Sequence, residues 1–129
     1  MKLAGTIKKG LGVVILSATF SVVSADEFVN GFIAAQDHEY QLAASTWEPL
    51  ARQGHAQAQF FLGMMYHSGI GGQLDEVAAV NLYHKAAENG NYNAQEYLAV
   101  AYREGWFGLK QSKKKARYWE KQLDQNPNR

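Results

Sequence analysis

Hydrophobic and polar positions follow a helical pattern from residue 26 to the end of the chain. In the segment 55–68, for example, apolar and small residues recur at intervals of three and four, which places them on one stripe of an α-helix. Strand-like alternation is absent, and glycine-rich breaks fall at regular intervals. The pattern predicts six helices in three antiparallel hairpins, over residues 26–36, 39–53, 55–68, 76–89, 92–104 and 113–125.

Residues at the expected helix ends support this division. Gly69 and Gly90 follow two of the helices, and glycine readily adopts the left-handed conformation that ends a helix. Asp75 and Ser112 precede two others, and their side chains are expected to cap them. Asn126-Pro127 is expected to end the ordered part of the chain.

The chain also contains an internal repeat with a period of 36 residues. When residues 51–72 are aligned with residues 87–108, eight of 22 positions are identical. These pairs are Ala51/Ala87, Gly54/Gly90, Ala58/Ala94, Gln59/Gln95, Leu62/Leu98, Tyr66/Tyr102, Gly69/Gly105 and Gly72/Gly108. A period of this length indicates a solenoid, in which each unit buries its apolar face against its neighbours. We therefore expect an all-α fold, an α/α superhelical solenoid with units at about 26–53, 54–89 and 90–125.

The same step of 36 residues carries Trp47 onto Tyr83 and Tyr83 onto Trp119. Large aromatic residues that recur at one place in successive helices usually pack in the core. These three side chains are therefore expected to be buried in the second helix of each hairpin.

The spacing of the repeated residues resembles a known repeat. The motif Ala51-x-x-Gly54-x-x-x-Ala58-Gln59-x-x-Leu62-Gly63-x-Met65-Tyr66-x-x-Gly69-x-Gly71 is similar to the Sel-1-like repeat, a relative of the tetratricopeptide repeat. The third unit departs from it, with Ala99 in place of the usual glycine and Trp106-Phe107 in a loop that usually carries small residues. The resemblance implies an α/α superhelix that acts as a protein–protein adaptor.

The N-terminal 25 residues have the layout of a secretory signal peptide. Lys2, Lys8 and Lys9 form a basic start, an apolar run follows, and the segment 23–25 has the small-x-small ending of a signal peptidase site. We expect cleavage before Asp26, and export to the periplasm or the medium. The apolar run is short for a transmembrane helix of about 20 residues. No cysteine follows it to carry a lipid anchor. Because the run is short and a lipid anchor is excluded, stable membrane insertion is not expected.

Cleavage would reverse the sign of the net charge. The full chain carries 13 basic and 12 acidic residues, and the signal segment removes three lysines, which leaves a net charge of −2. No overall basic bias therefore points to nucleic acid. The chain has no cysteine, so an exported form has no disulfide and depends on helix packing.

The sequence contains no recognisable catalytic, cofactor or metal motif. No two of the four histidines stand three or four residues apart, which is the spacing that places two metal ligands on one helix face. No serine lies in a Gly-x-Ser-x-Gly context, and a thiol nucleophile is impossible without cysteine. Glu96 and Glu104 are about 12 Å apart along a helix, which is too far for a glycosidase pair. We expect a protein that is not an enzyme and needs no cofactor or metal.

Two surfaces are candidates for binding. If Ala58 and Leu62 face the core, the concave side of the solenoid is lined by the partner-binding candidates Phe61, Met64, Tyr97 and Val100. Such a surface suits a helix or an extended peptide of a protein partner. The alternative, equally weighted, is that these side chains pack between adjacent units.

The second candidate surface is basic. It consists of Lys110, which precedes the last predicted helix, and of Lys113, Lys114, Arg117 and Lys121 on that helix, which also carries Lys115. This surface could bind an anionic envelope polymer such as a polysaccharide. The alternative is a solvated helix face whose cations are favoured by the helix dipole. The leading hypothesis is therefore an exported protein–protein adaptor, and the second is an envelope carbohydrate- or peptidoglycan-binding factor that uses the basic helix.

Overall fold

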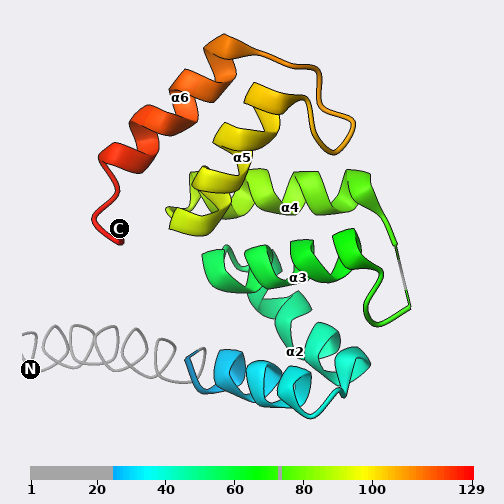
Figure 1. The fold of residues 1–129 in the computed structure, drawn as a ribbon. Coiled ribbons are helices and arrows are strands. Elements are labelled where there is room, and N and C mark those ends of the chain that lie inside the picture. The colour runs from blue at the N-terminus through cyan, green and yellow to red at the C-terminus, as the bar shows by residue number, and fades with distance from the viewer. Residues whose placement is uncertain (1–24, 73) are drawn as a thin grey trace, which may run out of the picture.

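A computed structural model describes residues 25–72 and 74–129, and this part of the chain folds as a stack of α-helices (Figure 1). The predicted signal peptide lies outside the described residues, apart from its last residue, Ala25. The described helices are residues 25–36, α2 (Tyr40–Arg52), α3 (Ala56–Ser68), α4 (Glu76–Glu88), α5 (Tyr92–Glu104) and α6 (Lys113–Asp124). Each bound lies within one residue of the bound predicted from the sequence.

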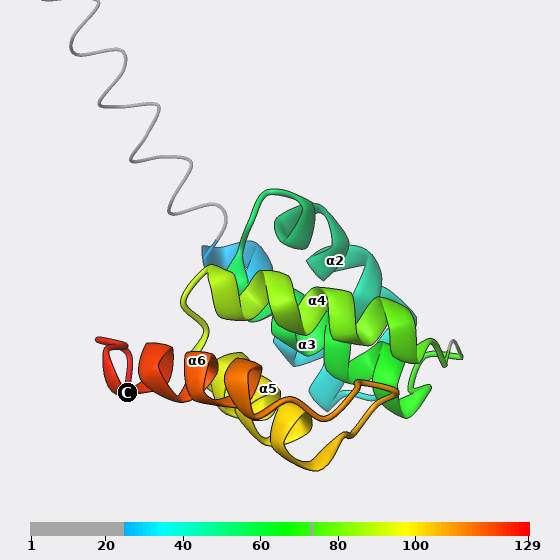
Figure 2. The same cartoon turned by 90° about the horizontal axis from the view of Figure 1, so that it is seen from above.

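The helices follow one another through the stack in chain order, as Figures 1 and 2 show from two directions. Helix α3 packs against α4, and α5 packs against α6, to form two hairpins. Helix α2 packs on α3, and α4 packs on α5, which joins each hairpin to the next. The described part is therefore an α/α repeat fold, as the periodicity predicted.

The predicted helix caps are confirmed. The Asp75 Oδ1 atom accepts a hydrogen bond from the Ala78 N–H at 2.9 Å, and the Ser112 Oγ atom accepts one from the Lys115 N–H at 3.3 Å. Each bond satisfies one backbone donor that the first turn of a helix leaves unpaired. Gly69 ends α3 with φ = 69°, a left-handed conformation that glycine adopts without a steric penalty.

The three aromatic residues related by the 36-residue step are buried, as predicted. Trp47, Tyr83 and Trp119 are exposed by only 1%, 1% and 5%. Gly31 and Gly63, on the preceding helices, make room for the first two rings. A Cβ atom on Gly31 would lie 2.4 Å from the Trp47 Nε1 atom, and one on Gly63 would lie 2.8 Å from the Tyr83 ring. The absent side chains therefore set how closely the two helices of a hairpin approach.

The close approach at Gly63 makes a substitution there informative. Alanine normally stabilises a helix by about 1 kcal/mol relative to glycine. Here the added methyl group would meet the Tyr83 ring and would lie 3.3 Å from the Ala79 carbonyl oxygen. We expect Gly63→Ala to lower the free energy of unfolding by about 1–3 kcal/mol, as overpacking does. Chemical denaturation of the two proteins tests this; a variant with raised stability would contradict the packing described.

Two glutamines at equivalent repeat positions connect successive hairpins. The buried Gln59 side chain donates to the Ala51 carbonyl oxygen at 2.9 Å and accepts from the Asn89 amide at 3.0 Å. In the next unit Gln95 donates to the Ala87 carbonyl oxygen at 3.0 Å, and its side-chain oxygen accepts from Asn126 at 2.8 Å. Buried polar groups of this kind are stable only when they are hydrogen-bonded. Both glutamines meet this condition, since each has a backbone carbonyl acceptor and an asparagine donor.

The prediction for the C-terminal end was wrong. Asn126 is only 8% exposed, and its amide also donates to the Gly90 carbonyl oxygen at 3.0 Å. It is therefore part of the fold, although Asn-Pro does stop the helix. The prediction failed because the local sequence does not show that this amide reaches a turn 36 residues earlier.

Candidate protein-binding surface

The first helix of each hairpin and the loop after α5 contribute to a strip of aromatic side chains, whose two halves are connected by the buried Tyr83 ring of α4. These helices are residues 25–36, α3 and α5. We call this set the aromatic strip: Phe28, Phe32, Phe60, Phe61, Tyr97, Trp106 and Phe107. Phe32 and Trp106 are 40% and 49% exposed, and the other members are partly buried. The strip is therefore exposed to solvent near each end, and the rings between the two ends are partly buried against the core.

In the first half of the strip, Phe61 is the centre of a cluster of rings. Its centroid lies 5.2 Å from that of Trp47, 5.8 Å from that of Phe28 and 6.0 Å from that of Phe32. The Phe60 centroid lies 5.9 Å from it. Tilted and edge-to-face contacts at such distances contribute about 0.5–1.5 kcal/mol each beyond area burial.

In the second half of the strip, two tyrosines meet a histidine. The hydroxyl oxygens of Tyr97 and Tyr83 lie 2.8 Å and 3.3 Å from the His67 Nδ1 atom. Burial raises the pKa of Tyr83, with the Tyr97 phenol as a second cause, and burial also raises the pKa of Tyr97. Both phenols therefore remain protonated at neutral pH and can donate hydrogen bonds. This network fixes the orientation of the Tyr97 ring.

Phe107 completes the strip from the loop between α5 and α6. Its ring stacks on Tyr97 at 4.9 Å and meets the His67 ring edge-on at 4.3 Å. Its backbone has φ = 56°, which is unfavourable for a residue with a side chain. The ring contacts stabilise this conformation. Sequence analysis missed the roles of His67 and Phe107, and the only signal was the presence of large residues in a loop that usually carries small ones.

The partner-binding candidates differ in exposure. Met64 is 45% exposed, whereas Phe61, Tyr97 and Val100 are partly buried. Phe61 and Tyr97 pack against the two hydrophobic clusters of the core. They are joined through Phe60 and Tyr83, since successive ring centroids lie 5.9, 5.7 and 4.6 Å apart. Phe61 and Tyr97 thus pack between units and also form part of the strip, while Met64 offers the largest exposed fraction.

The basic surface lies on α6 and on the loop before it, which carries Lys110. Its five members are exposed, and none forms an ion pair with another residue in the described part: Lys110, Lys113, Lys114, Arg117 and Lys121. The opposite face of α6 buries Ala116 and Trp119 in the core. Residues 26–109 carry three basic and ten acidic side chains, whereas residues 110–129 carry seven basic and two acidic ones. Residues 26–129 are therefore electrically polarised, with their positive charge concentrated in the last 20 residues.

A histidine beneath this surface is half-buried. The His84 Nε2 atom lies 3.0 Å from the Tyr102 hydroxyl oxygen, and the His84 ring packs near Trp119. Burial lowers the pKa of His84 below its ordinary value of 6.5, with Glu88 opposing the shift and Lys115 adding to it. The unfolded chain therefore binds a proton at this residue more readily than the folded chain does.

The lowered pKa of His84 predicts how the stability of the protein changes with pH. Since the folded pKa is the lower one, the free energy of unfolding falls as the pH decreases through about 6.5. We expect His84→Gln, whose amide can still bond to Tyr102, to lose less stability than the unmodified protein between about pH 7.5 and pH 5.5. Denaturation at both pH values measures this. The control is His38→Gln at an exposed histidine; an equal pH dependence for His84→Gln and the unmodified protein would contradict the prediction.

Within residues 25–72 and 74–129, no group of three or more His, Cys, Asp or Glu side chains is arranged to hold a metal ion. None of the helices described is both long enough and apolar enough to cross a bilayer.

Comparison with known proteins identifies the repeats. The Sel1 repeat family matches residues 56–91 and 93–119, which span α3–α4 and most of α5–α6. The chain carries Sel1 repeats. Such repeats generally mediate protein–protein interactions.

A curated relative and the solved structures add to this comparison. The chain is 31% identical over 87 residues to the DAP3-binding cell death enhancer 1 of Rattus norvegicus. The aligned segment covers 67% of this chain but only 17% of that relative. No solved structure matches the chain.

Proposed function

We propose that the protein is an exported adaptor that binds a protein partner across the aromatic strip of its Sel1 repeats. One observation carries the proposal: ring-to-ring contacts join all three hairpins, with Tyr83 as the link between the second and the third, and the strip has exposed aromatic members at both ends. Interfaces concentrate their binding energy in a few aromatic anchors on a rigid base, and this strip has both features. The rat relative's name describes a protein that binds another protein, DAP3, which agrees with this class of function.

The residues proposed for partner binding have two different roles. Phe32 and Met64, which are 40% and 45% exposed, would contact the partner directly. Phe61, Tyr97 and Val100 would support that surface from below, since they are only partly exposed. An amphipathic helix or an extended apolar segment of the partner fits a surface of this kind.

Site-specific photo-crosslinking tests the proposal. A photoreactive phenylalanine would replace Met64 in one form of the protein and Val77 in another. Val77 is the control because it is apolar, 73% exposed and located on α4. We expect a discrete crosslinked protein from position 64 in intact cells and none from position 77. Equal crosslinking from both positions, or none from position 64, would contradict the proposal.

The proposed location outside the cytoplasm rests on the signal-peptide pattern. The mature protein would begin at Asp26 and reside in the periplasm or the medium of a bacterium. N-terminal sequencing of the protein from fractionated cells tests this. Recovery of a form that still begins at Met1 in the cytosol would contradict it.

The second candidate function is binding of an anionic envelope polymer by α6. It is supported by the five exposed basic side chains that have no ion-pair partner in the described part, and by the charge polarity of the chain. Binding of this kind weakens steeply with salt, because its energy comes from screened charges. Charge reversal at Lys113 and Arg117 should abolish retention on an acidic polysaccharide, and Met64→Ala should leave it unchanged.

A further inference from the structure

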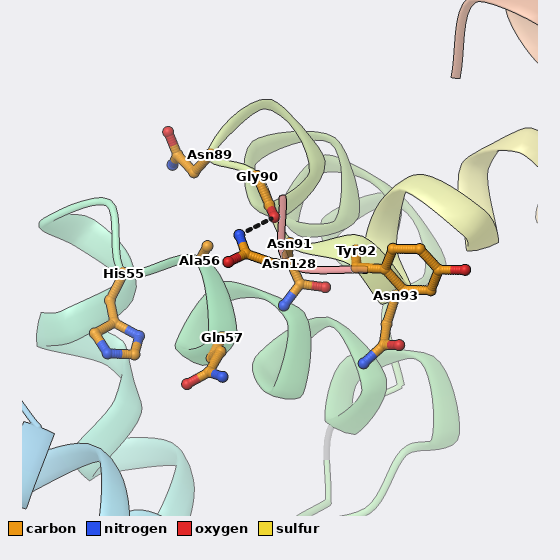
Figure 3. A pocket seen from close by; sticks show the side chains of 9 residues that line it. All are labelled: His55, Ala56, Gln57, Asn89, Gly90, Asn91, Tyr92, Asn93 and Asn128. Atoms are coloured by element: carbon orange, nitrogen blue, oxygen red, sulfur yellow. Dashed lines mark hydrogen bonds between the residues drawn. The ribbon is translucent and has the colours of Figure 1, made fainter. Parts of the chain in front are cut away.

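A pocket of about 410 Å³ lies between the start of α3, the turn from α4 to α5 and the C-terminal tail. Its lining residue His55 stacks on Phe28, a member of the aromatic strip, at 5.1 Å. This volume is within the range of about 300–1,000 Å³ that is typical of small-ligand sites. Figure 3 shows the nine residues that line it: His55, Ala56, Gln57, Asn89, Gly90, Asn91, Tyr92, Asn93 and Asn128. Five of the nine carry a carboxamide, and none carries a carboxylate, an ammonium or a guanidinium group.

Helix capping positions two of the polar side chains. The His55 Nδ1 atom accepts a hydrogen bond from the Ala58 N–H at 3.2 Å, and the Asn91 Oδ1 atom accepts one from the Ala94 N–H at 2.8 Å. These bonds leave the other polar group of each side chain, the His55 Nε2–H and the Asn91 NH₂, as donors for a ligand. Burial lowers the pKa of His55 below its ordinary value of 6.5, which favours the neutral ring.

Two further amides stand at equivalent repeat positions. Gln57 and Asn93 are separated by 36 residues, both are exposed, and neither side chain has a hydrogen-bond partner within residues 25–72 and 74–129. Asn128 approaches from the tail, where its amide donates to the Gly90 carbonyl oxygen at 3.4 Å (Figure 3). Amide groups therefore converge on the pocket from three separate segments of the chain.

This lining selects a particular chemistry. Each carboxamide offers both donors and an acceptor, so the pocket matches a ligand whose groups also donate and accept on several sides. Hydroxyl groups do this, and the partly exposed Tyr92 beside Asn93 offers a ring for an apolar ligand face (Figure 3). A charged ligand would find no opposite charge among the lining residues. An extended peptide main chain presents its polar groups along its two edges and none on its two faces, so it would leave amides that surround it on the other sides unpaired.

We propose that this pocket binds a neutral saccharide. None of the lining residues belongs to the aromatic strip, although the His55 ring stacks on Phe28 at its border. The protein would therefore contact a partner and a glycan through different residues. Binding does not depend on the basic helix, since α6 does not line the pocket.

Titration of the ¹⁵N-labelled protein with chitotriose, cellotriose and maltotriose tests the proposal. We expect at least one of these neutral trisaccharides to shift the resonances of the pocket residues, with saturation at millimolar concentration or below. Gln57→Ala and Asn93→Ala should each weaken that binding by about fivefold or more, because each removes a hydrogen-bonding group that the fold does not use. Asn81→Ala, at an exposed amide on α4, is the matched control and should bind as the unmodified protein does.

Three results would overturn the proposal. The first is the absence of shifts in the pocket with all three trisaccharides at 20 mM. The second is binding that survives both Gln57→Ala and Asn93→Ala unchanged. The third is a response of the pocket to a neutral peptide amide, such as tetra-alanine amide, with no response to any saccharide. Crosslinking from position 64 is measured separately, so failure of the saccharide site leaves the adaptor proposal standing, and the reverse also holds.

Discussion

Replacement of Trp47 by alanine is expected to have the largest effect on stability of any change considered. The indole is 1% exposed, it packs near the rings of Phe28 and Phe61, and its Nε1–H donates to the Phe28 carbonyl oxygen at 3.1 Å. Truncation of a buried tryptophan costs about 3–5 kcal/mol, because the surrounding residues fill the cavity only partly. For a domain of this size, such a loss should lower the Tm by at least about 12 °C.

Trp106→Ala provides a matched control for this prediction. It removes the same side chain from a position that is 49% exposed, in the loop between α5 and α6. We expect a loss of about 1 kcal/mol or less, as for most surface substitutions. Thermal and chemical denaturation of both variants measures the difference. Equal losses in the two variants would show that Trp47 does not hold the first hairpin together.

The contrast between the two tryptophans shows how far the sequence could predict the fold. The repeat step places Trp47, Tyr83 and Trp119 at one position, and the glycine-containing breaks mark the helix ends. Both signals are local or periodic, so helix bounds, caps and core aromatics could all be predicted. The residue 36 positions before Trp106 is Ile70, so the repeat step relates Trp106 to no other aromatic residue. Its place in a predicted loop also distinguished it from the aromatic residues of the core.

The ring contacts of the strip could not be predicted in the same way. The contact of Phe107 with His67 depends on the backbone conformation of a loop, and His67 stands alone in its position of the repeat. Asn126 is a similar case, because its bond to Gln95 joins residues 31 positions apart. Interactions of this type are set by how helices stack, and helical periodicity alone does not specify that stacking.

The amide-lined pocket illustrates the same limit at a possible binding site. Gln57 and Asn93 are equivalent under the 36-residue step, but the sequence does not show that the C-terminal tail lies beside them. The tail was expected to be disordered, whereas Asn128 lies against the turn at Gly90. A site built from three segments becomes visible only when the fold brings them together.

Phe61→Ala is expected to have the second-largest effect, and its outcome decides between the two roles predicted for this residue. The ring is partly buried and contacts four aromatic neighbours, so we expect a loss of about 2–4 kcal/mol, slightly less than for a fully buried phenylalanine. Met64→Ala, one turn further along α3, should cost less than about 1 kcal/mol, because that side chain is 45% exposed.

Partner binding should show the opposite order. With the photoreactive group at position 32, we expect Met64→Ala to weaken crosslinking about tenfold while the fold remains intact, as truncation of an interface anchor does. Phe61→Ala should lower crosslinking only in proportion to the fraction of unfolded protein. Circular dichroism, denaturation and crosslinking of the two variants separate these outcomes. If Phe61→Ala kept full stability and selectively lost crosslinking, Phe61 would be a direct contact to the partner and its support of the strip from below would be excluded.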